Sequence, residues 1–224
     1  MANNLITNIK NFIIGFIPPH LMNIYRKIKK TFLEPFKKDE VIKLFDGEEL
    51  LFMDLLDDCS VYGEYGCGES TIYAANNTDK EIISIDNSIE WINKVKGRIS
   101  QERIIDLHHS DMGDLLPWGF PRTYDYKENF KDYFEYMWMK DKTPDFVLID
   151  GRFRVACFLT TLLYAEKDTL VLFDDYVDRG IYKIVEKFIK PIEINGRQAV
   201  FRIQKSFQEN ELKDYISRFE LVFD

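Results

Sequence analysis

The sequence predicts an α/β fold, in which helices cover both faces of a mainly parallel β-sheet. Short apolar runs of strand length recur along the 224-residue chain, and segments with helical spacing of apolar residues separate most of them. Strands that alternate with helices in this way form right-handed crossovers and pair in parallel. Near the end of the chain, Asn195-Gly196 separates two short apolar segments, which is a strong signal for an antiparallel hairpin.

Each predicted element follows from its local pattern. Apolar runs bounded by polar or turn-forming residues predict strands at 59–65, 81–85, 104–108, 145–149, 169–173, 192–194 and 199–204. Helical periodicity predicts helices at 48–56, 70–76, 88–100, 153–165 and 182–188. The connection at 111–143 is long, rich in aromatic residues, and includes a predicted helix near 129–140. It either packs against the sheet or forms a wall or lid of an acceptor pocket.

Charge divides the chain into a basic N-terminal extension, residues 1–40, and an acidic domain, residues 41–224. Residues 1–38 carry seven basic side chains against one acidic, although the whole chain has a net charge of −8. The acidic domain predicts that the chain does not bind nucleic acid. Residues 5–33 contain a basic amphipathic pattern, which favours either packing on the domain or on a second subunit of a homodimer, or peripheral contact with an anionic membrane.

Three cysteines, Cys59, Cys67 and Cys157, are an odd number without metal-site spacing, which favours a reducing cytoplasm over a disulfide framework. The apolar run near the N-terminus is too short to span a bilayer, and no signal-cleavage pattern follows it. We therefore expect a cytoplasmic protein, with membrane association as an additional interpretation of the basic extension.

The most informative segment is the glycine turn Glu64-Tyr-Gly66-Cys67-Gly68, directly after the first predicted strand. Its glycines allow the backbone to approach a ligand closely, and Ser70 is placed to cap the helix that follows. The dinucleotide fingerprint G-x-G-x-x-G requires a third glycine, but Thr71 stands at that position. The acidic side chain of Glu64 would repel a pyrophosphate and attract a cationic ligand.

The turn resembles the first motif of the class I S-adenosylmethionine-dependent methyltransferases, an acidic residue followed by x-G-x-G. The resemblance covers about residues 41–205 and implies a Rossmann-like three-layer sandwich with a seven-stranded sheet. It implies that Asp86, at the end of the second strand, holds the ribose hydroxyls, and that Asp111 lies near the adenine amino group. The implied S-adenosylmethionine site consists of Glu64, Gly66, Cys67, Gly68, Ser70, Asp86, Asn87, Asp111 and Met112.

Three more carboxylates follow later strands, Asp150 after the fourth and Asp174 and Asp175 after the fifth. Because the carboxyl ends of parallel strands share one edge, we expect these groups to converge. Converging carboxylates need a cation or a proton between them, and oxygen ligands suit Mg²⁺ or Mn²⁺. The pattern resembles the metal-dependent O-methyltransferases of catechols and of macrolide or aminocoumarin sugars. That resemblance implies that the three aspartates bind a metal, which activates an acceptor hydroxyl.

One position departs from the catechol-type pattern, because Phe153 stands where those enzymes place a lysine base. Asp150, His109 and solvent are the remaining candidates for the base. Arg152 stays protonated and so is a poor base. It either holds an acidic acceptor, such as a phosphate or a uronate, or forms a surface ion pair. Without a metal, the paired aspartates after the fifth strand would serve as caps of the turn before the next helix.

The sequence therefore predicts a methyltransferase that uses S-adenosylmethionine to methylate a hydroxyl of a small molecule or a glycan with the help of a divalent metal. The basic extension and the glycan resemblance point to polysaccharide biosynthesis. An NAD-dependent oxidoreductase is one alternative, which the missing third glycine and Glu64 disfavour. A non-catalytic S-adenosylmethionine-binding domain is the other, which the absent lysine base favours.

Overall fold

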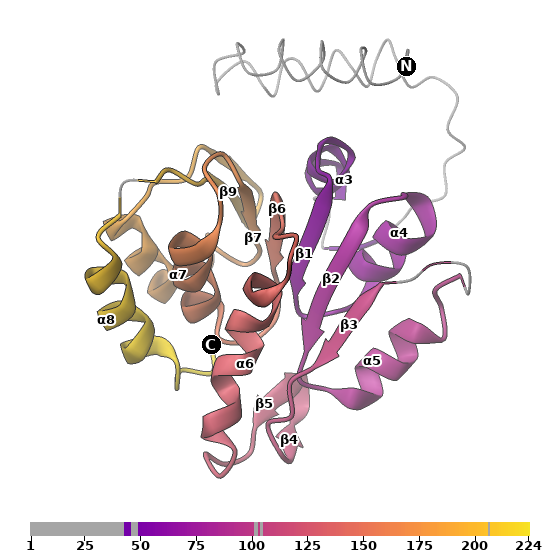
Figure 1. Ribbon diagram of the computed structural model, residues 1–224, viewed down its shortest axis with the longest axis horizontal. Helices are drawn as coiled ribbons and strands as arrows, with labels where there is room; N and C mark the ends of the chain where they lie inside the picture. The colour runs from indigo at the N-terminus through magenta and orange to yellow at the C-terminus, as the bar shows by residue number, and fades with distance from the viewer. Residues whose placement is uncertain (1–42, 46–48, 101–102, 104, 206) are drawn as a thin grey trace. The chain divides into compact units, whose positions relative to one another are not determined.

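A computed structural model describes residues 43–45, 49–100, 103, 105–205 and 207–224 (Figure 1). The described residues belong to one compact unit, Lys43–Asp224. The predicted basic extension at 1–40, and the membrane or subunit contact expected of residues 5–33, lie outside the described residues. The division of the chain at residue 40 therefore stays a prediction.

The centre of the unit is a seven-stranded sheet with the strand order β3-β2-β1-β6-β7-β9-β8. The first five strands in this order are parallel, and β9 and β8 are antiparallel to their neighbours. The predicted α/β class, with a mainly parallel seven-stranded sheet and a C-terminal hairpin, is confirmed. The strands are β1 Val61–Tyr65, β2 Glu81–Asp86, β3 Asp106–His109, β6 Phe146–Ile149, β7 Leu170–Phe173, β8 Glu193–Asn195 and β9 Gln198–Arg202.

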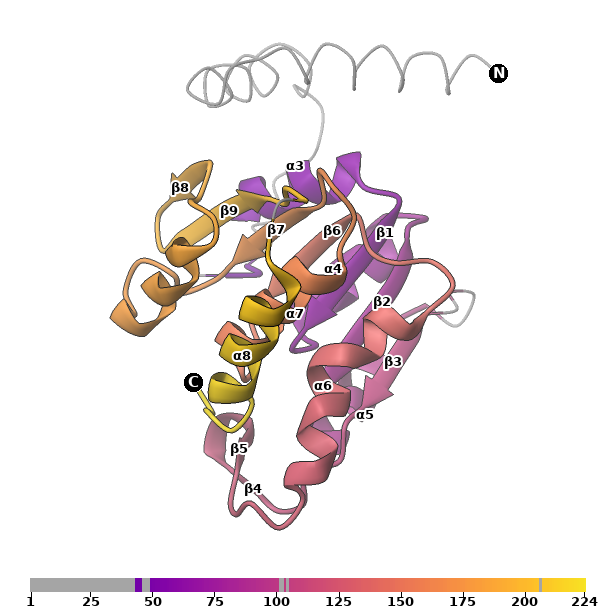
Figure 2. The same ribbon diagram turned by 60° about the vertical axis from the view of Figure 1, so that its left-hand side comes forward.

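Helices cover both faces of the sheet, which gives the predicted three layers (Figures 1 and 2). One face carries α6 (Phe130–Glu135), α7 (Arg154–Tyr164) and α8 (Glu209–Phe219), and the other carries α3 (Glu49–Asp58), α4 (Glu69–Asn77) and α5 (Ile89–Lys96). Successive side chains of β6 point to opposite faces of the sheet and contribute to a hydrophobic core on each face. Val147 and Ile149 pack toward α7, whereas Phe146 and Leu148 pack toward α3. No helix within the described part of the chain is both long and apolar enough to cross a membrane.

Several elements differ from the expected ones. The segment expected to be a helix at 182–188 is the 3₁₀ helix Gly180–Lys187, and α5 ends at Lys96, just before Gly97. The elements that were not predicted include two with clear local structure. One is α8, whose buried Leu212 and Ile216 are four residues apart on one face. The other is a two-residue hairpin of β4 (Leu115–Leu116) and β5 (Phe120–Pro121), which is shorter than any strand that apolar alternation reveals.

The strand order places a reversal of direction between β1 and β6. From β1 the chain continues outward to β2 and β3, whereas β6 lies on the other side of β1 and is followed by β7. Ligands of open α/β sheets bind outside the carboxyl ends of the strands at such a reversal. The glycine turn after β1, Asp86 of β2, and the aspartates after β6 and β7 therefore all lie at the ligand-binding edge.

Candidate functional site

A cavity of about 510 Å³ lies at this edge of the sheet, a volume typical of small-molecule sites. Its walls come from the turns after β1, β2 and β6, from α5, and from the long connection between β3 and β6. The residues that line it are Leu44, Gly66, Cys67, Gly68, Glu69, Ser70, Asp86, Asn87, Ser88, Trp91, Trp118, Gly119, Tyr133, Asp150, Gly151 and Arg152. The structure thus brings together most of the residues predicted for the cofactor site, together with two of the three predicted catalytic residues.

The glycine turn requires glycine at position 66, whereas position 68 has room for a Cβ. Gly66 has φ +93°, and a Cβ at this position would lie 2.6 Å from the Cα of Gly151. The turns after β1 and β6 therefore pack backbone against backbone, which a larger residue would prevent. At Gly68 an added Cβ would meet nothing closer than Trp91 Nε1, at 3.7 Å. Gly68 thus leaves open space where the turn faces the cavity.

Glu64 lies beneath the glycine turn rather than in the cavity. Its side chain is fully buried (0% exposed) and accepts hydrogen bonds from the hydroxyls of Ser70, Thr71 and Ser84. Burial raises the pKa of Glu64, and these three hydroxyls oppose the rise. Glu64 therefore supports the turn from beneath, and the predicted attraction between its charge and a cationic ligand stays a prediction.

Ser70 and Thr71 also have roles that the sequence did not indicate. Gly68, not Ser70, is the N-cap residue of α4, and its backbone N–H donates to Thr71 Oγ1 at 2.8 Å. The residue that replaces the third glycine of a dinucleotide motif thus organises the turn itself. Ser70 lines the cavity, but its hydroxyl is engaged with Glu64.

Asp86 is the carboxylate that faces the cavity at the end of β2. It is 9% exposed and accepts backbone hydrogen bonds from Cys67 at 3.0 Å and from Ser88 at 2.7 Å. Burial raises the pKa of Asp86 to about 6, although these two hydrogen bonds oppose the rise. Asn87 donates to the Gly119 carbonyl at 2.7 Å and so ties the β4–β5 hairpin to the cavity. Asp86 and the turn after β1 thus form one connected surface.

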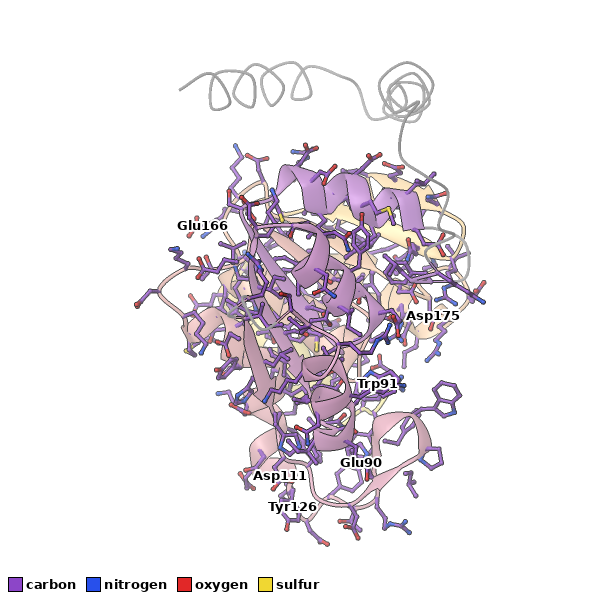
Figure 3. The ribbon with its side chains drawn as sticks, turned by 90° about the vertical axis from the view of Figure 1, so that its right-hand side faces the viewer. Glu90, Trp91, Asp111, Tyr126, Glu166 and Asp175 are labelled. Atoms are coloured by element: carbon purple, nitrogen blue, oxygen red, sulfur yellow. The ribbon has the colours of Figure 1, made fainter. Side chains whose placement is uncertain are left out.

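Besides Glu64 and the two aspartates after β7, three more predicted site residues lie outside the cavity lining. The side chain of Asp111 is exposed and accepts a hydrogen bond from Gly113 N–H at 2.9 Å, and Figure 3 shows Asp111 toward the lower end of the molecule, apart from Asp175. Met112 is buried against Asn87. His109 Nε2 lies 3.1 Å from the Asn87 carbonyl oxygen. The cofactor contacts expected of Asp111 and Met112, and the role of His109 as a base, stay predictions.

Asp150 and Asp174 follow neighbouring strands, but their side chains have different surroundings. Asp174 is fully buried, and its two oxygens accept hydrogen bonds from Arg197 at 2.8 and 3.1 Å and from Gln198 at 2.9 Å. Asp150 lines the cavity, and its side chain is 32% exposed. Burial raises the pKa of Asp150, and Arg154 opposes this rise.

The guanidinium of Arg154 stands between Asp150 and Asp175, where the resemblance placed a metal. Its Nη2 lies 3.1 Å from Asp150 Oδ1, and its Nη1 lies 3.2 Å from Asp175 Oδ2. Arg179 contacts the same oxygen of Asp175 at 3.1 Å. No group of three potential ligands for a metal ion occurs among the residues that the structure describes. The carboxylates have cations of the chain as partners, so this donor set does not fit the predicted Mg²⁺ or Mn²⁺ site.

Phe153 explains why no lysine base is found at its position. It has φ +53° and ψ +35°, is fully buried, and packs against Phe130, Tyr133 and Phe223. A side chain here points into the core behind the cavity. Such a conformation in a bulky residue is strained and is common next to functional sites. The neighbouring Arg152 instead lines the cavity, and its backbone N–H donates to the Tyr133 hydroxyl at 3.1 Å.

Aromatic side chains form part of the cavity, and sequence reasoning assigned them no individual role. Trp118 is 87% exposed and has φ +66° within the turn between β4 and β5. Trp91 of α5 also lines the cavity, and Figure 3 shows its position. The connection at 111–143 thus supplies both a cavity wall, through Trp118 and Tyr133, and core residues such as Phe134. The sequence signal for this part of the cavity is a tryptophan between two turn-forming residues, Pro117 and Gly119.

Comparisons with known proteins agree with this geometry. No family model matches the sequence, and no curated protein matches it. Among solved structures, the chain is similar to the crystal structure of a methyltransferase-like protein from Silicibacter pomeroyi, with a TM-score of 0.68 and 29% sequence identity. The similarity covers 77% of this chain and 92% of that protein. The chain has a methyltransferase fold. In this methyltransferase fold, the cavity lies at the reversal between β1 and β6, where such sheets bind their ligands.

Proposed function

We propose that this chain is an S-adenosylmethionine-dependent methyltransferase that acts on a hydroxyl oxygen. The observation that carries the proposal is the shared cavity of the glycine turn, Asp86 and Asp150. The similarity to a methyltransferase-like protein supports it independently. Function does not follow from fold alone, so the proposal depends on whether these residues can perform the chemistry.

The residues present fit the nucleoside part of S-adenosylmethionine. Asp86 has its carboxylate at the cavity surface and can accept hydrogen bonds from both hydroxyls of a ribose. Gly66 and Gly68 keep the turn free of side chains, so that a ligand can approach the backbone. Glu64 contributes indirectly, because it fixes Ser70 and Thr71 and thereby the shape of the turn.

S-adenosylmethionine supplies a methyl group on a cationic sulfur, and transfer of this group to oxygen breaks the carbon–sulfur bond and leaves a neutral thioether. Asp150 is the carboxylate on the β6 side of the cavity, and we assign to it the proton that the acceptor hydroxyl loses. Arg154 Nη2 lies 3.1 Å from Asp150 Oδ1 and so orients this carboxylate. Most of the rate enhancement would then come from positioning within the cavity.

The acceptor belongs to the same proposal, as a small molecule or a glycan. Trp118 and Trp91, two aromatic side chains that are partly or largely exposed, line the cavity. Aromatic faces of this kind bind the apolar faces of sugars and other rings through dispersion and burial of apolar surface. Since the carboxylates after β6 and β7 are paired with arginines, no step of this mechanism passes through a metal.

The oxidoreductase alternative is weaker in this structure. The spacing Tyr-x-x-x-Lys, which would mark one class of oxidoreductases, occurs at Tyr25 and Lys29, outside the described residues, and within them at Tyr136 and Lys140. Only the second pair can be compared with the cavity. Both side chains contact Asp106, at 3.0 and 2.8 Å, and neither lines the cavity. A dinucleotide would also have to accept Thr71, whose hydroxyl is already engaged by the turn, in place of the third glycine.

Calorimetric titration with S-adenosylmethionine, S-adenosylhomocysteine and NAD tests the proposal. We expect the first two to bind and NAD not to bind. Asp86→Ala should abolish this binding, and Asp111→Ala should leave it unchanged, because Asp111 lies outside the cavity. Binding of NAD without S-adenosylhomocysteine would refute the proposal. A non-catalytic domain is distinguished by transfer of a labelled methyl group into a glycan-rich extract, which such a domain would not support.

A further inference from the structure

The turn after β6 carries three consecutive residues that line the cavity, Asp150, Gly151 and Arg152. The next residue is Phe153, the N-cap residue of α7, whose φ of +53° lies in the left-handed region. A bulky residue in this conformation costs about 1–3 kcal/mol and persists only where its surroundings enforce it. Phe153 also provides no side-chain cap for the first N–H groups of α7. Both features require partners from elsewhere in the chain.

Asp224 supplies the missing cap of α7. Its side chain accepts hydrogen bonds from the backbone N–H groups of Arg154, at 2.6 Å, and of Val155, at 3.4 Å. Its main-chain oxygen accepts a third hydrogen bond from Arg152 Nη1, at 3.0 Å. Burial raises the pKa of Asp224, and the N–H groups of Arg154 and Val155 oppose the rise. Asp224 thus contacts residues on both sides of Phe153, and its carboxylate lies at the end of the helix that favours negative charge.

Phe223 contacts the strained residue itself. The centre of its ring lies 5.3 Å from that of Phe153, at an interplanar angle of 82°. It also lies 5.5 Å from the ring centre of Phe130, which packs against Phe153 as well. Phe223 and Asp224 therefore hold both the buried ring of Phe153 and the N–H groups that follow it. Together they enforce the left-handed conformation at this position.

The side chain of Arg154 connects this arrangement to the cavity. Its Nη2 donates to Asp150 Oδ1 at 3.1 Å, and its Nε donates to the Gly151 carbonyl at 3.0 Å. Arg154 is buried, with 3% of its surface exposed. Since Asp224 accepts from the backbone N–H of the same arginine, hydrogen bonds lead without interruption from Asp224 to Asp150. Asp224 itself is not among the residues that line the cavity.

We propose that Asp224 is a positioning residue for Asp150, the group to which we assign the proton of the acceptor. It acts through Arg154, because it fixes the start of α7 and with it the position from which the guanidinium binds Asp150. This inference rests on the proposed methyl transfer and adds to it a residue that contacts neither substrate. Misplacement of a reacting group by about 1 Å can lower a rate about a hundredfold. Loss of the cap should therefore reduce methyl transfer much more than cofactor binding.

Transfer of a labelled methyl group from S-adenosylmethionine into a glycan-rich extract measures the first quantity, and calorimetry with S-adenosylhomocysteine measures the second. In Asp224→Ala we expect the rate to fall at least about tenfold and the affinity to change less than about threefold. Asp224→Asn should recover part of the rate, because asparagine is also a good N-cap residue. Asp214→Ala is the matched control, since Asp214 is 52% exposed and pairs with Arg218 on the surface of α8. It should change neither quantity.

A third measurement does not depend on activity. In ¹⁵N NMR spectra, the Nε–H signal of Arg154 should shift in Asp224→Ala and stay unchanged in Asp214→Ala. An unchanged signal in Asp224→Ala would exclude the route through Arg154 and overturn the inference. The same measurement on Asp224→Asn serves if the alanine variant does not fold.

Two further results would also overturn the inference. One is an unchanged rate in the Asp224 variants. The other is a loss of cofactor affinity as large as the loss of rate, because Asp224 would then only stabilise the fold. If the unmodified protein binds no S-adenosylhomocysteine or transfers no methyl group, the proposed function itself fails. If it does both and only the Asp224 variants behave differently from our expectation, the failure concerns the positioning role alone.

Discussion

Asp86→Asn should make the ligand-free protein more stable at neutral pH while it weakens cofactor binding. In the folded chain, burial raises the pKa of Asp86 from its ordinary value of 3.8 to about 6. Between these two values the unfolded chain has already released the proton and the folded chain has not. Stability therefore falls as pH rises through this window, and the full penalty is present above about pH 6. Asparagine carries no charge, so the variant does not have this free-energy penalty.

The magnitude follows from the size of the shift. A rise of about two pKa units corresponds to roughly 3 kcal/mol of unfavourable free energy at neutral pH. Asparagine has one acceptor oxygen for the two N–H groups of Cys67 and Ser88, so one hydrogen bond is lost, at a cost of about 1–2 kcal/mol. The net gain at pH 7.5 should be about 1–2 kcal/mol. Between pH 4.5 and 7.5, the difference between variant and unmodified protein should shift by about 2 kcal/mol.

Urea unfolding at several pH values measures this difference, and calorimetry measures the affinity for S-adenosylhomocysteine. Loss of a hydrogen bond to a charged acceptor should weaken binding by about tenfold to a hundredfold. Asp111→Asn is the control, since its exposed side chain predicts a stability change within about 0.5 kcal/mol. An Asp86→Asn protein that is less stable at pH 7.5, or a difference that does not depend on pH, would refute the reasoning.

Two further predictions concern the turns around the cavity. Gly66→Ala should lower the free energy of unfolding in urea by about 1–3 kcal/mol, because the residue has φ +93° and its Cβ would meet the backbone of Gly151. Gly180→Ala is the control. Its Cβ would meet nothing within 4 Å, so the free energy of unfolding should change by less than about 0.5 kcal/mol. Mn²⁺ should leave the melting temperature of the unmodified protein unchanged, whereas Arg154→Met should lose about 3–5 kcal/mol and regain part of it when Mn²⁺ is added. A large Mn²⁺-induced rise in the unmodified protein would contradict this account.

The sheet was predictable from sequence because its strands carry unambiguous signals. The buried runs of β6 and β7, each followed by aspartate, and the turn at Asn195-Gly196 depend only on local chemistry. The β4–β5 hairpin was not predictable, since two-residue strands carry no periodicity. The amphipathic spacing of α8 was present in the sequence, at Leu212 and Ile216, and was not recognised.

The site was predicted in part, and the errors share one physical cause. Motif spacing places a residue at a strand end, but it does not say toward which side the side chain points or what it contacts. Glu64 and Asp86 both lie close to the glycine turn, yet one is sealed beneath it and the other faces the cavity. The partners that decide this, such as Ser84 for Glu64, lie on other strands. Tertiary contacts of this kind cannot be read from a single sequence.

The arginine partners of the aspartates could not be predicted from the sequence either. They change how a methyl acceptor would be recognised. Arg154 and Arg197 lie four or more positions along the chain from the aspartates they neutralise, so a pattern of acids alone suggests a metal. A metal would select an acceptor by chelation of neighbouring oxygens. With the carboxylates already paired, selection of an acceptor would fall to the side chains that line the cavity.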